Sequence, residues 1–423
     1  MREDGLAARD AAEQVARRSY GKLVAYLSGR ARDVAAAEDA LADAFAAALA
    51  DWPRNGIPQS PEAWLLAVAR RRTIDAARRQ RTGEQAADHL AMMHDELEAA
   101  AANASDIPDQ RLALMFACAH PAIEPAIRAP LILQTVLGFD AATVASAFLV
   151  APATMGQRLS RAKQKIARAG VPFRVPDRAD LDANRAERLD AVLAAIYAAF
   201  AEGWSDPAGT ETRRRNLSEE GIWLGRLVAS LMPDEPEALG LLALMLHAEA
   251  RRNARRDAAG DYIPLAGQDT AQWDDALIDE AEALLRRASD LAATSVGAVG
   301  RYQLEAAVQS AHAARRITGE VDWAAIEKFY DALLTLSGSP VVAINRAVAI
   351  AETQGAAAGL AALDALADDV RLAEYQPYWA ARAVMLARIG DTPEAVRAYE
   401  RAIGLERDPA VRRFLQQRSA ALR

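Results

Sequence analysis

Residues 139–168 constrain the fold of this chain more than any other part of its sequence. Residues 141–148 have the length and composition of a short helix, and 149–151 have those of a turn. Pro152 then stands at the first position of a longer helix that runs to Arg168, where proline is well tolerated. Two helices joined by a short turn form a helix-turn-helix, so we predict this motif here.

The longer helix of this motif is predicted to have two different faces. Its apolar residues recur at steps of four and three and form a seam for burial: Met155, Leu159, Ala162, Ile166 and Ala169. The polar face carries the candidate residues for contact with duplex DNA: Thr154, Gln157, Arg158, Arg161 and Lys165. Arginine can read guanine bidentately, and further cations can hold phosphates. The alternative is an amphipathic helix whose basic face is only solvated.

The composition favours helices throughout the chain. Of the 423 residues, 52% are hydrophobic and only 6% aromatic, and many of the hydrophobic ones are alanine, the best helix former. Clusters of β-branched residues framed by turns, which mark strands, are scarce. The length predicts two to four compact units. We therefore predict an all-α fold built from several domains.

The distribution of charge matters more than its total. The net charge is −8, which argues against a chain that is basic over its whole surface. Two short segments are nevertheless locally basic, and both fall in predicted helices of the N-terminal portion. The first contains Arg70, Arg71, Arg72, Arg78, Arg79 and Arg81, and the second lies on the helix that follows Pro152.

An acidic helix precedes the first basic segment. Residues 33–50 read as an amphipathic helix with Glu38, Asp39 and Asp43 clustered on it, a natural docking surface for a basic partner. A loop rich in proline and glycine is predicted at 52–58. Ser60 and Pro61 then have the residue types of an N-cap and a first helical position.

The C-terminal portion has the character of a helical repeat. The turn at 390–395 is followed by Tyr399, Ala402 and Pro409, which resembles the second helix of a tetratricopeptide (TPR) repeat. Ala347, Ala351 and Gly355 begin a weaker copy about one period of ~34 residues upstream. A generic helical bundle remains the alternative to a repeat array.

These segments in this order resemble the extracytoplasmic-function sigma factors of bacterial RNA polymerase. The match rests on the acidic segment 38–45, the basic segment 64–81 and the helix-turn-helix at 141–165. Segments 107–112, 118–122 and 171–178 narrow it to the subgroup with a long C-terminal TPR-like extension, as do 234–245 and 339–347. The resemblance implies sigma region 2 at 8–82, a linker at 83–108 and region 4 at 109–170. An extended connector at 171–186 and a regulatory helical domain at 187–423 follow.

The resemblance also implies roles for particular residues. Glu38, Asp39 and Asp43 are expected to grip the clamp of the polymerase β′ subunit. The predicted region 2 contacts with the promoter −10 element are Asn55, Ile57, Arg70, Arg71, Arg72 and Arg78. Arg71 stands where the family usually has asparagine. Thr154, Gln157, Arg158, Arg161 and Lys165 are expected to read the −35 element.

The partners implied are core RNA polymerase, through its β′ clamp and β subunit, and promoter DNA. The C-terminal domain is expected to pack on the sigma domains or to bind a regulator. A second hypothesis is a DNA-binding transcriptional activator with a TPR-type sensor domain. We expect no enzymatic activity, cofactor or metal site, since Cys118 is the only cysteine. With no signal peptide and no apolar run of about 20 residues, we also expect a cytoplasmic protein.

Overall fold

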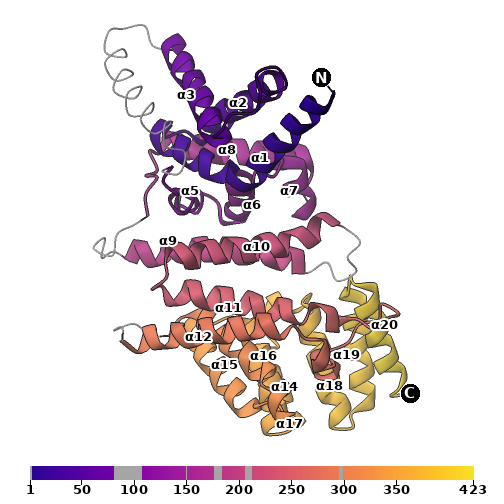
Figure 1. The fold of residues 1–423 in the computed structure, drawn as a ribbon. Coiled ribbons are helices and arrows are strands. Elements are labelled where there is room, and N and C mark those ends of the chain that lie inside the picture. Colours follow the sequence, from indigo (N-terminus) through magenta and orange to yellow (C-terminus); the bar gives the residue numbers. More distant parts are fainter. Residues whose placement is uncertain (1, 81–106, 149, 176–182, 205–211, 295–298) are drawn as a thin grey trace. The chain divides into compact units, whose positions relative to one another are not determined.

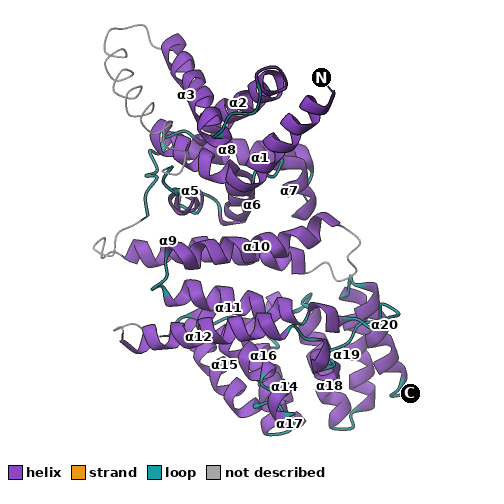
Figure 2. Ribbon diagram, in the orientation of Figure 1, coloured by secondary structure: helices purple, strands orange, loops and turns teal. Residues whose placement is uncertain are grey.

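The computed structural model describes residues 2–80, 107–148, 150–175, 183–204, 212–294 and 299–423. Within these ranges the chain is helical, as predicted, and holds no strand apart from one isolated bridge between Arg256 and Tyr262 (Figure 2). It divides into two compact units. The N-terminal unit comprises residues 1–205 and 211–221, and the C-terminal unit comprises 206–210 and 222–423.

The N-terminal unit begins with α1 (Arg2–Ala31), α2 (Val34–Asn55) and α3 (Pro61–Gln80). The loop predicted at 52–58 is shorter in the structure, because α2 continues through Pro53. Trp52 holds this last turn in place: its side chain is buried and packs edge-on against Trp64, with ring centroids 5.6 Å apart. The helix ends at Asn55, and the N–H of the C-cap residue Gly56 still donates to the Trp52 carbonyl. Gly56 then leaves the helix with a positive φ of 87°, which glycine adopts readily.

The described part of residues 107–175 contains four further helices: α5 (Arg111–Cys118), α6 (Pro125–Leu137), α7 (Ala141–Ala147) and α8 (Pro152–Arg168). Helices α7 and α8 have the bounds expected of the helix-turn-helix, to within one residue. Asp140 starts α7 by accepting a hydrogen bond from the Thr143 N–H at 2.6 Å. Helix α1 packs against α2 and α3 and also against α5 and α6.

Helix α9 (Ala183–Trp204) and the beginning of α10 (Thr212–Leu231) group with the N-terminal unit. This differs from the boundary predicted at residue 187. The reason is packing: α9 lies against α5 and α6, and the Arg188 guanidinium sits 5.6 Å from the centroid of the Phe116 ring. A boundary read from sequence cannot detect such a contact, because 72 residues separate the two side chains.

The C-terminal unit continues with α11 (Pro236–Ala250), α12 (Asp275–Thr294), α13 (Arg301–Ala313), α14 (Arg315–Thr318), α15 (Trp323–Ser337), α16 (Pro340–Thr353), α17 (Ala356–Asp364), α18 (Gln376–Arg388), α19 (Thr392–Leu405) and α20 (Pro409–Ala420). Its contacts run mainly between helices that are close neighbours along the chain. Helical-repeat arrays are built in this way. Gly355 directly precedes α17, and Gly390 lies two positions before α19; both adopt positive φ, at 96° and 85°.

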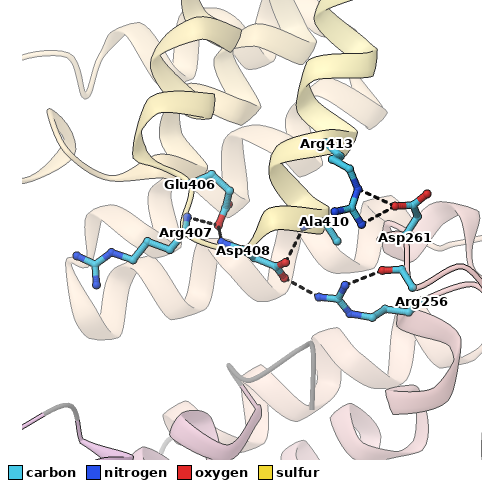
Figure 3. A network of polar contacts seen from close by, with 8 residues as sticks. Arg256, Asp261, Glu406, Arg407, Asp408, Ala410 and Arg413 are labelled. Carbon is cyan, nitrogen blue, oxygen red and sulfur yellow. Dashed lines mark hydrogen bonds and ion pairs between the residues drawn. The ribbon is translucent and has the colours of Figure 1, made fainter. Parts of the chain in front are cut away.

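A polar network ties the last helix to a turn 152 residues earlier (Figure 3). The Arg256 guanidinium donates to the Gly260 carbonyl at 2.8 Å and to the Asp408 carboxylate at 2.7 Å. Arg413, on α20, donates to Asp261 at 2.7 Å. The turn that holds Arg256 and Asp261 therefore fixes the C-terminal end of the unit.

Candidate nucleic-acid interface

Helix α8 separates an apolar seam from a basic face, as the sequence predicts. Met155, Leu159 and Ile166 are each at most 1% exposed, and Ala162 is 7% exposed. Ala169 is exposed, because the helix ends at Arg168. All five predicted DNA-contacting residues are exposed: Thr154, Gln157, Arg158, Arg161 and Lys165.

These five side chains are free to contact a partner. Among the residues that the structure describes, they form no ion pair and no side-chain hydrogen bond, and α8 itself contains no acidic residue. Arg158, Arg161 and Lys165 line one wall of a hollow of about 230 Å³ beside the start of α6. A cationic face without internal partners attracts phosphates through counterion release.

Lys163 differs from the other cations of α8. It is buried, and its ammonium group forms an ion pair with the carboxylate of Glu38 on α2. Lys163 belongs to the second basic segment, and the sequence pattern did not predict its burial. Its spacing carried a signal: Lys163 follows Leu159 by four positions and precedes Ile166 by three, which places it on the seam side of the helix.

The three predicted clamp-binding residues do not share one environment. The side chain of Glu38 is only 14% exposed, whereas Asp39 and Asp43 are exposed. Burial raises the pKa of Glu38, and the Lys163 ammonium lowers it in opposition. Only Asp39 and Asp43 are therefore open to a partner in this conformation.

The predicted −10 residues also divide into exposed and buried groups. Asn55, Arg71 and Arg72 are exposed, and Ile57 is an exposed apolar residue in the loop between α2 and α3. Arg70 differs from the prediction, because the structure buries it at 8% exposure. The side chain of Arg78 lies outside the described part of the chain. Of the predicted −10 residues, the exposed ones are therefore Asn55, Ile57, Arg71 and Arg72.

An exposed ion pair connects the acidic and basic helices of this region. The Arg72 guanidinium lies 4.0 Å from the Asp43 carboxylate, and both side chains are more than half exposed. Such a pair contributes little to stability, typically about 0–1 kcal/mol. Both groups can therefore exchange this contact for one with a partner at little cost.

Cys118 is part of the core and is unsuited to metal binding. It is completely buried, and its Sγ lies 3.4 Å from the Thr135 hydroxyl. Burial raises the pKa of this thiol to about 12, so it remains protonated at neutral pH. The described residues contain no cluster of three or more histidine, cysteine, aspartate or glutamate side chains that could hold a metal ion. None of the described helices is long and apolar enough to cross a membrane.

Comparison with known proteins identifies the N-terminal region. The sigma-70 region 2 family matches residues 15–82, and a family of unknown function, DUF6596, matches residues 188–289. An uncharacterized protein of Rhizobium meliloti (strain 1021) is 39% identical over 391 residues, which are 92% of this chain and 89% of the relative. No solved structure matches the chain. The chain belongs to the same family as the Rhizobium protein, and its sigma-70 region 2 domain gives it a sigma-factor-like role in transcription initiation.

Proposed function

We propose that the chain is an extracytoplasmic-function sigma factor that binds core RNA polymerase and directs it to promoters. One observation carries this proposal: a single compact unit combines a sigma-70 region 2 domain with a helix-turn-helix whose Arg158, Arg161 and Lys165 are exposed and pair with no acid among the described residues. The function consists of binding and strand separation, with no covalent step. It requires the compartment that holds RNA polymerase, the cytoplasm.

In this proposal α8 reads the −35 element. Thr154 and Gln157 lie near its N-terminal end, the end that a recognition helix inserts into the major groove. Arg158 and Arg161 supply guanidinium groups for base edges, and Lys165 supplies a cation for the phosphate backbone. The exposure of all five side chains supports this assignment.

Region 2 would bind the polymerase clamp and the −10 element. Asp39 and Asp43 are exposed on α2 and offer carboxylates to a basic clamp surface. Asn55 at the end of α2 and Ile57 in the loop that follows would hold an unstacked base, beside the cations Arg71 and Arg72. Extruding a base costs a few kcal/mol, which these contacts must offset.

The C-terminal unit would set the activity of the N-terminal unit in transcription initiation, either by packing on it or by binding a protein regulator. A hollow of about 500 Å³ supports a binding role; its walls include Asp364, Tyr378, Trp379, Arg382 and Glu394. Truncation after residue 176 would also remove α9, so a substitution is the better test. If Trp379→Ala left promoter output in cells unchanged under all growth conditions, this hollow would have no regulatory role.

A DNA-binding activator with a sensor domain is the second candidate, and the exposed basic face of α8 supports it equally. The region 2 domain separates the two hypotheses. An activator does not need to occupy the polymerase clamp, whereas a sigma factor must.

Run-off transcription with purified bacterial core polymerase tests the proposal. The template is DNA from upstream of genes that neighbour this chain's own gene. We expect a transcript that requires the full chain and is lost with Arg158→Ala plus Arg161→Ala. A matched control is Arg226→Ala plus Arg287→Ala, which removes the same charge from exposed ion pairs of the C-terminal unit. Duplex binding without a transcript would favour the activator. If the chain gave no transcript and also bound no duplex, both hypotheses would be refuted.

A further inference from the structure

Arg251 is a cation of the C-terminal unit that lacks an acidic partner. It is the C-cap residue of α11, a helix that packs against α12 and α13 (Figure 1). Its Nη2 donates to the side-chain oxygen of Gln309 on α13, and its Nη1 is buried without a hydrogen-bond partner. No carboxylate in the described part of the chain forms an ion pair with this guanidinium. Arg256, on the segment that follows α11, differs because it pairs with Asp408.

The position of Arg251 at the end of α11 does not explain why it is buried. A cation at a helix C-terminus is stabilised when it lies over the last carbonyls. The side-chain hydrogen bond of Arg251, however, goes to Gln309 on another helix. Burial lowers the pKa of this guanidinium to about 10, with Arg255 and Arg315 adding to the effect, so it stays charged at neutral pH. A buried charge and a buried donor without partners both cost stability.

Arg315, at the start of α14, is a second cation without an acid. Its two Nη atoms donate to the backbone carbonyls of Ala266 and Gln268 at 2.9 and 2.8 Å, and its Cζ lies 5.2 Å from the centroid of the Trp273 ring. These partners are neutral, and among the described residues Arg315 forms no ion pair. Its neighbour Arg316 pairs with two aspartates instead. Arg251 and Arg315 thus remain as two positive charges without a counter-charge.

The electrostatic potential between α11 and α13 is positive. Burial lowers the pKa of His312 to about 4, with Arg251 and Arg315 adding to the effect. Burial also lowers the pKa of His247 to about 3, again with a contribution from Arg251. Glu282 lies 3.5 Å from Nε2 of His247 but pairs with neither arginine. This cluster can therefore accept negative charge.

Unpaired hydrogen-bond donors lie in the same region. Trp273 follows η4 (Thr270–Gln272) and packs in one apolar cluster with Ala250 and Ala313, the last residues of α11 and α13. Its Nε1 is buried without a hydrogen-bond partner, as are both ring nitrogens of His247. An indole has only a donor, and a neutral imidazole has one N–H. An oxyanion accepts hydrogen bonds from all of these groups and from the guanidinium of Arg251.

Two uncompensated positive charges suit a ligand with two negative charges. A phosphate group carries about −1.5 to −2 charges at pH 7, and a guanidinium can bind it through two parallel hydrogen bonds. We propose that Arg251 and Arg315 form a phosphate-binding site in the C-terminal unit, with the Trp273 indole as a further donor. Both arginines are only partly exposed, so the ligand is small: inorganic phosphate or a phosphorylated metabolite. The site would give the proposed regulatory unit a chemical signal, but binding itself does not require sigma activity.

Calorimetric titration of the full chain with inorganic phosphate tests the proposal. The ionic strength is held constant with chloride, because non-specific attraction to a basic surface is screened by salt. We expect saturable binding with a Kd below about 1 mM. The chain with Arg158→Ala plus Arg161→Ala should bind equally well, which excludes the basic face of α8 as the site. Absence of saturable binding to the folded wild-type chain would overturn the inference.

Two variants locate the site. Arg251→Gln and Arg315→Gln each remove one charge, and each should weaken phosphate binding about tenfold or more, as charge-assisted hydrogen bonds are lost. The matched control is Arg287→Gln, which removes the same charge from an exposed ion pair with Asp234 and should leave the affinity unchanged. Circular dichroism shows whether each variant folds. Wild-type affinity in a folded Arg251→Gln chain would overturn the assignment.

Thermal denaturation without phosphate separates binding from a structural role of Arg251. A guanidinium retained for a ligand is an uncompensated charge in the free chain, so Arg251→Gln should melt at the same or a higher temperature than wild type. Added phosphate should raise the melting temperature of wild type and not that of the variant. A lower melting temperature with unchanged phosphate binding would show that Arg251 only stabilises the fold.

Three further probes identify the ligand class. Glycerol phosphate that binds more tightly than inorganic phosphate would indicate a phosphorylated metabolite, and equal affinity would indicate free phosphate; both results support the site. Succinate also carries two negative charges, but on separate groups, and should bind about tenfold more weakly. Equal affinity for succinate would overturn the assignment to phosphate. Glycerol should not bind. Since no measurement involves transcription, failure of the sigma proposal would leave these outcomes unaffected.

Discussion

Helix α8 in the N-terminal unit and the helices of the C-terminal unit are both rich in arginine, but their arginines have different surroundings. Arg158 and Arg161 extend into solvent and pair with no acid among the described residues. In the C-terminal unit, by contrast, arginines repeatedly pair with carboxylates on other segments; examples are Arg226 with Glu280, Arg388 with Glu352 and Arg413 with Asp261.

The difference indicates what the charge does in each unit. A guanidinium that already holds a carboxylate fixes the position of two helices and has fewer donors for a partner. A guanidinium without an acid remains available to phosphate or to a base edge. Arginine content alone therefore does not locate a nucleic-acid interface, and the presence or absence of internal acids does.

The largest effect is expected from removing the unpaired arginines. Arg158→Ala plus Arg161→Ala should weaken binding of polymerase holoenzyme to promoter duplex by about 30-fold or more, at roughly 1–3 kcal/mol per side chain. The free energy of unfolding should change by less than about 0.5 kcal/mol, because neither side chain pairs with another residue in the part of the chain that the structure describes. Fluorescence anisotropy and urea denaturation measure the two quantities. A large loss of stability with unchanged DNA binding would show that Arg158 and Arg161 stabilise the fold, as the paired arginines of the C-terminal unit do, and do not contact DNA.

Removing a paired arginine should have the opposite result. Arg256 and Asp408 are both mostly buried, and Arg256 also holds the Gly260 carbonyl. Arg256→Ala should therefore destabilise the C-terminal unit by about 2–3 kcal/mol, since it leaves a carboxylate poorly compensated. Promoter-duplex affinity should stay the same at a temperature where the variant is folded. Thermal denaturation that matches wild type would show that the network in Figure 3 carries no stability.

The burial of His247 should make the stability of the C-terminal unit depend on pH. The ring of His247 is 1% exposed, and burial lowers its pKa to about 3, with Arg251 and Arg316 adding to the effect. Glu282 lies 3.5 Å from Nε2, but an ion pair needs a protonated ring, which burial opposes. In the unfolded chain the pKa is about 6.5, so the unfolded state alone takes up a proton as the pH falls below that value.

This contribution to stability is complete above pH 6.5 and is lost as the pH falls toward 3. Between pH 7 and pH 5 the loss should be about 2 kcal/mol, at 1.36 kcal/mol per pH unit below 6.5. His247→Gln should reduce the pH dependence of the unfolding free energy by this amount, whatever its own stability at pH 7. An unchanged slope between pH 5 and pH 7 would show that His247 takes up its proton equally in the folded and unfolded states.

The smallest effect is expected from an exposed pair of the same unit. Arg287 and Asp234 lie 3.5 Å apart, and both side chains are more than half exposed. Arg287→Ala should change the unfolding free energy by no more than about 0.5 kcal/mol, because solvent and salt screen such pairs. If Arg287→Ala lowered the unfolding free energy as much as Arg256→Ala does, burial would not explain the difference between buried and exposed ion pairs.

The local elements of the candidate site could be predicted well from sequence. The bounds of α7 and α8 and the burial of Met155, Leu159 and Ile166 follow from helical spacing, because side chains three and four positions apart share one face. The helix start at Pro61 follows equally from local chemistry. Pro53 was misjudged, because a local rule that favours a loop could not include the anchoring of Trp52 against Trp64.

The amino-acid sequence by itself thus determined the helical class and the two faces of α8, one apolar and one basic. The tertiary structure alone decided the burial of Arg70, the packing of α9 on the N-terminal unit and the pairing of Lys163 with Glu38. The physical reason is the distance along the sequence over which each interaction acts. Periodicity and capping act within one or two turns of a helix, whereas Lys163 and Glu38 lie 125 residues apart and meet only when their helices pack.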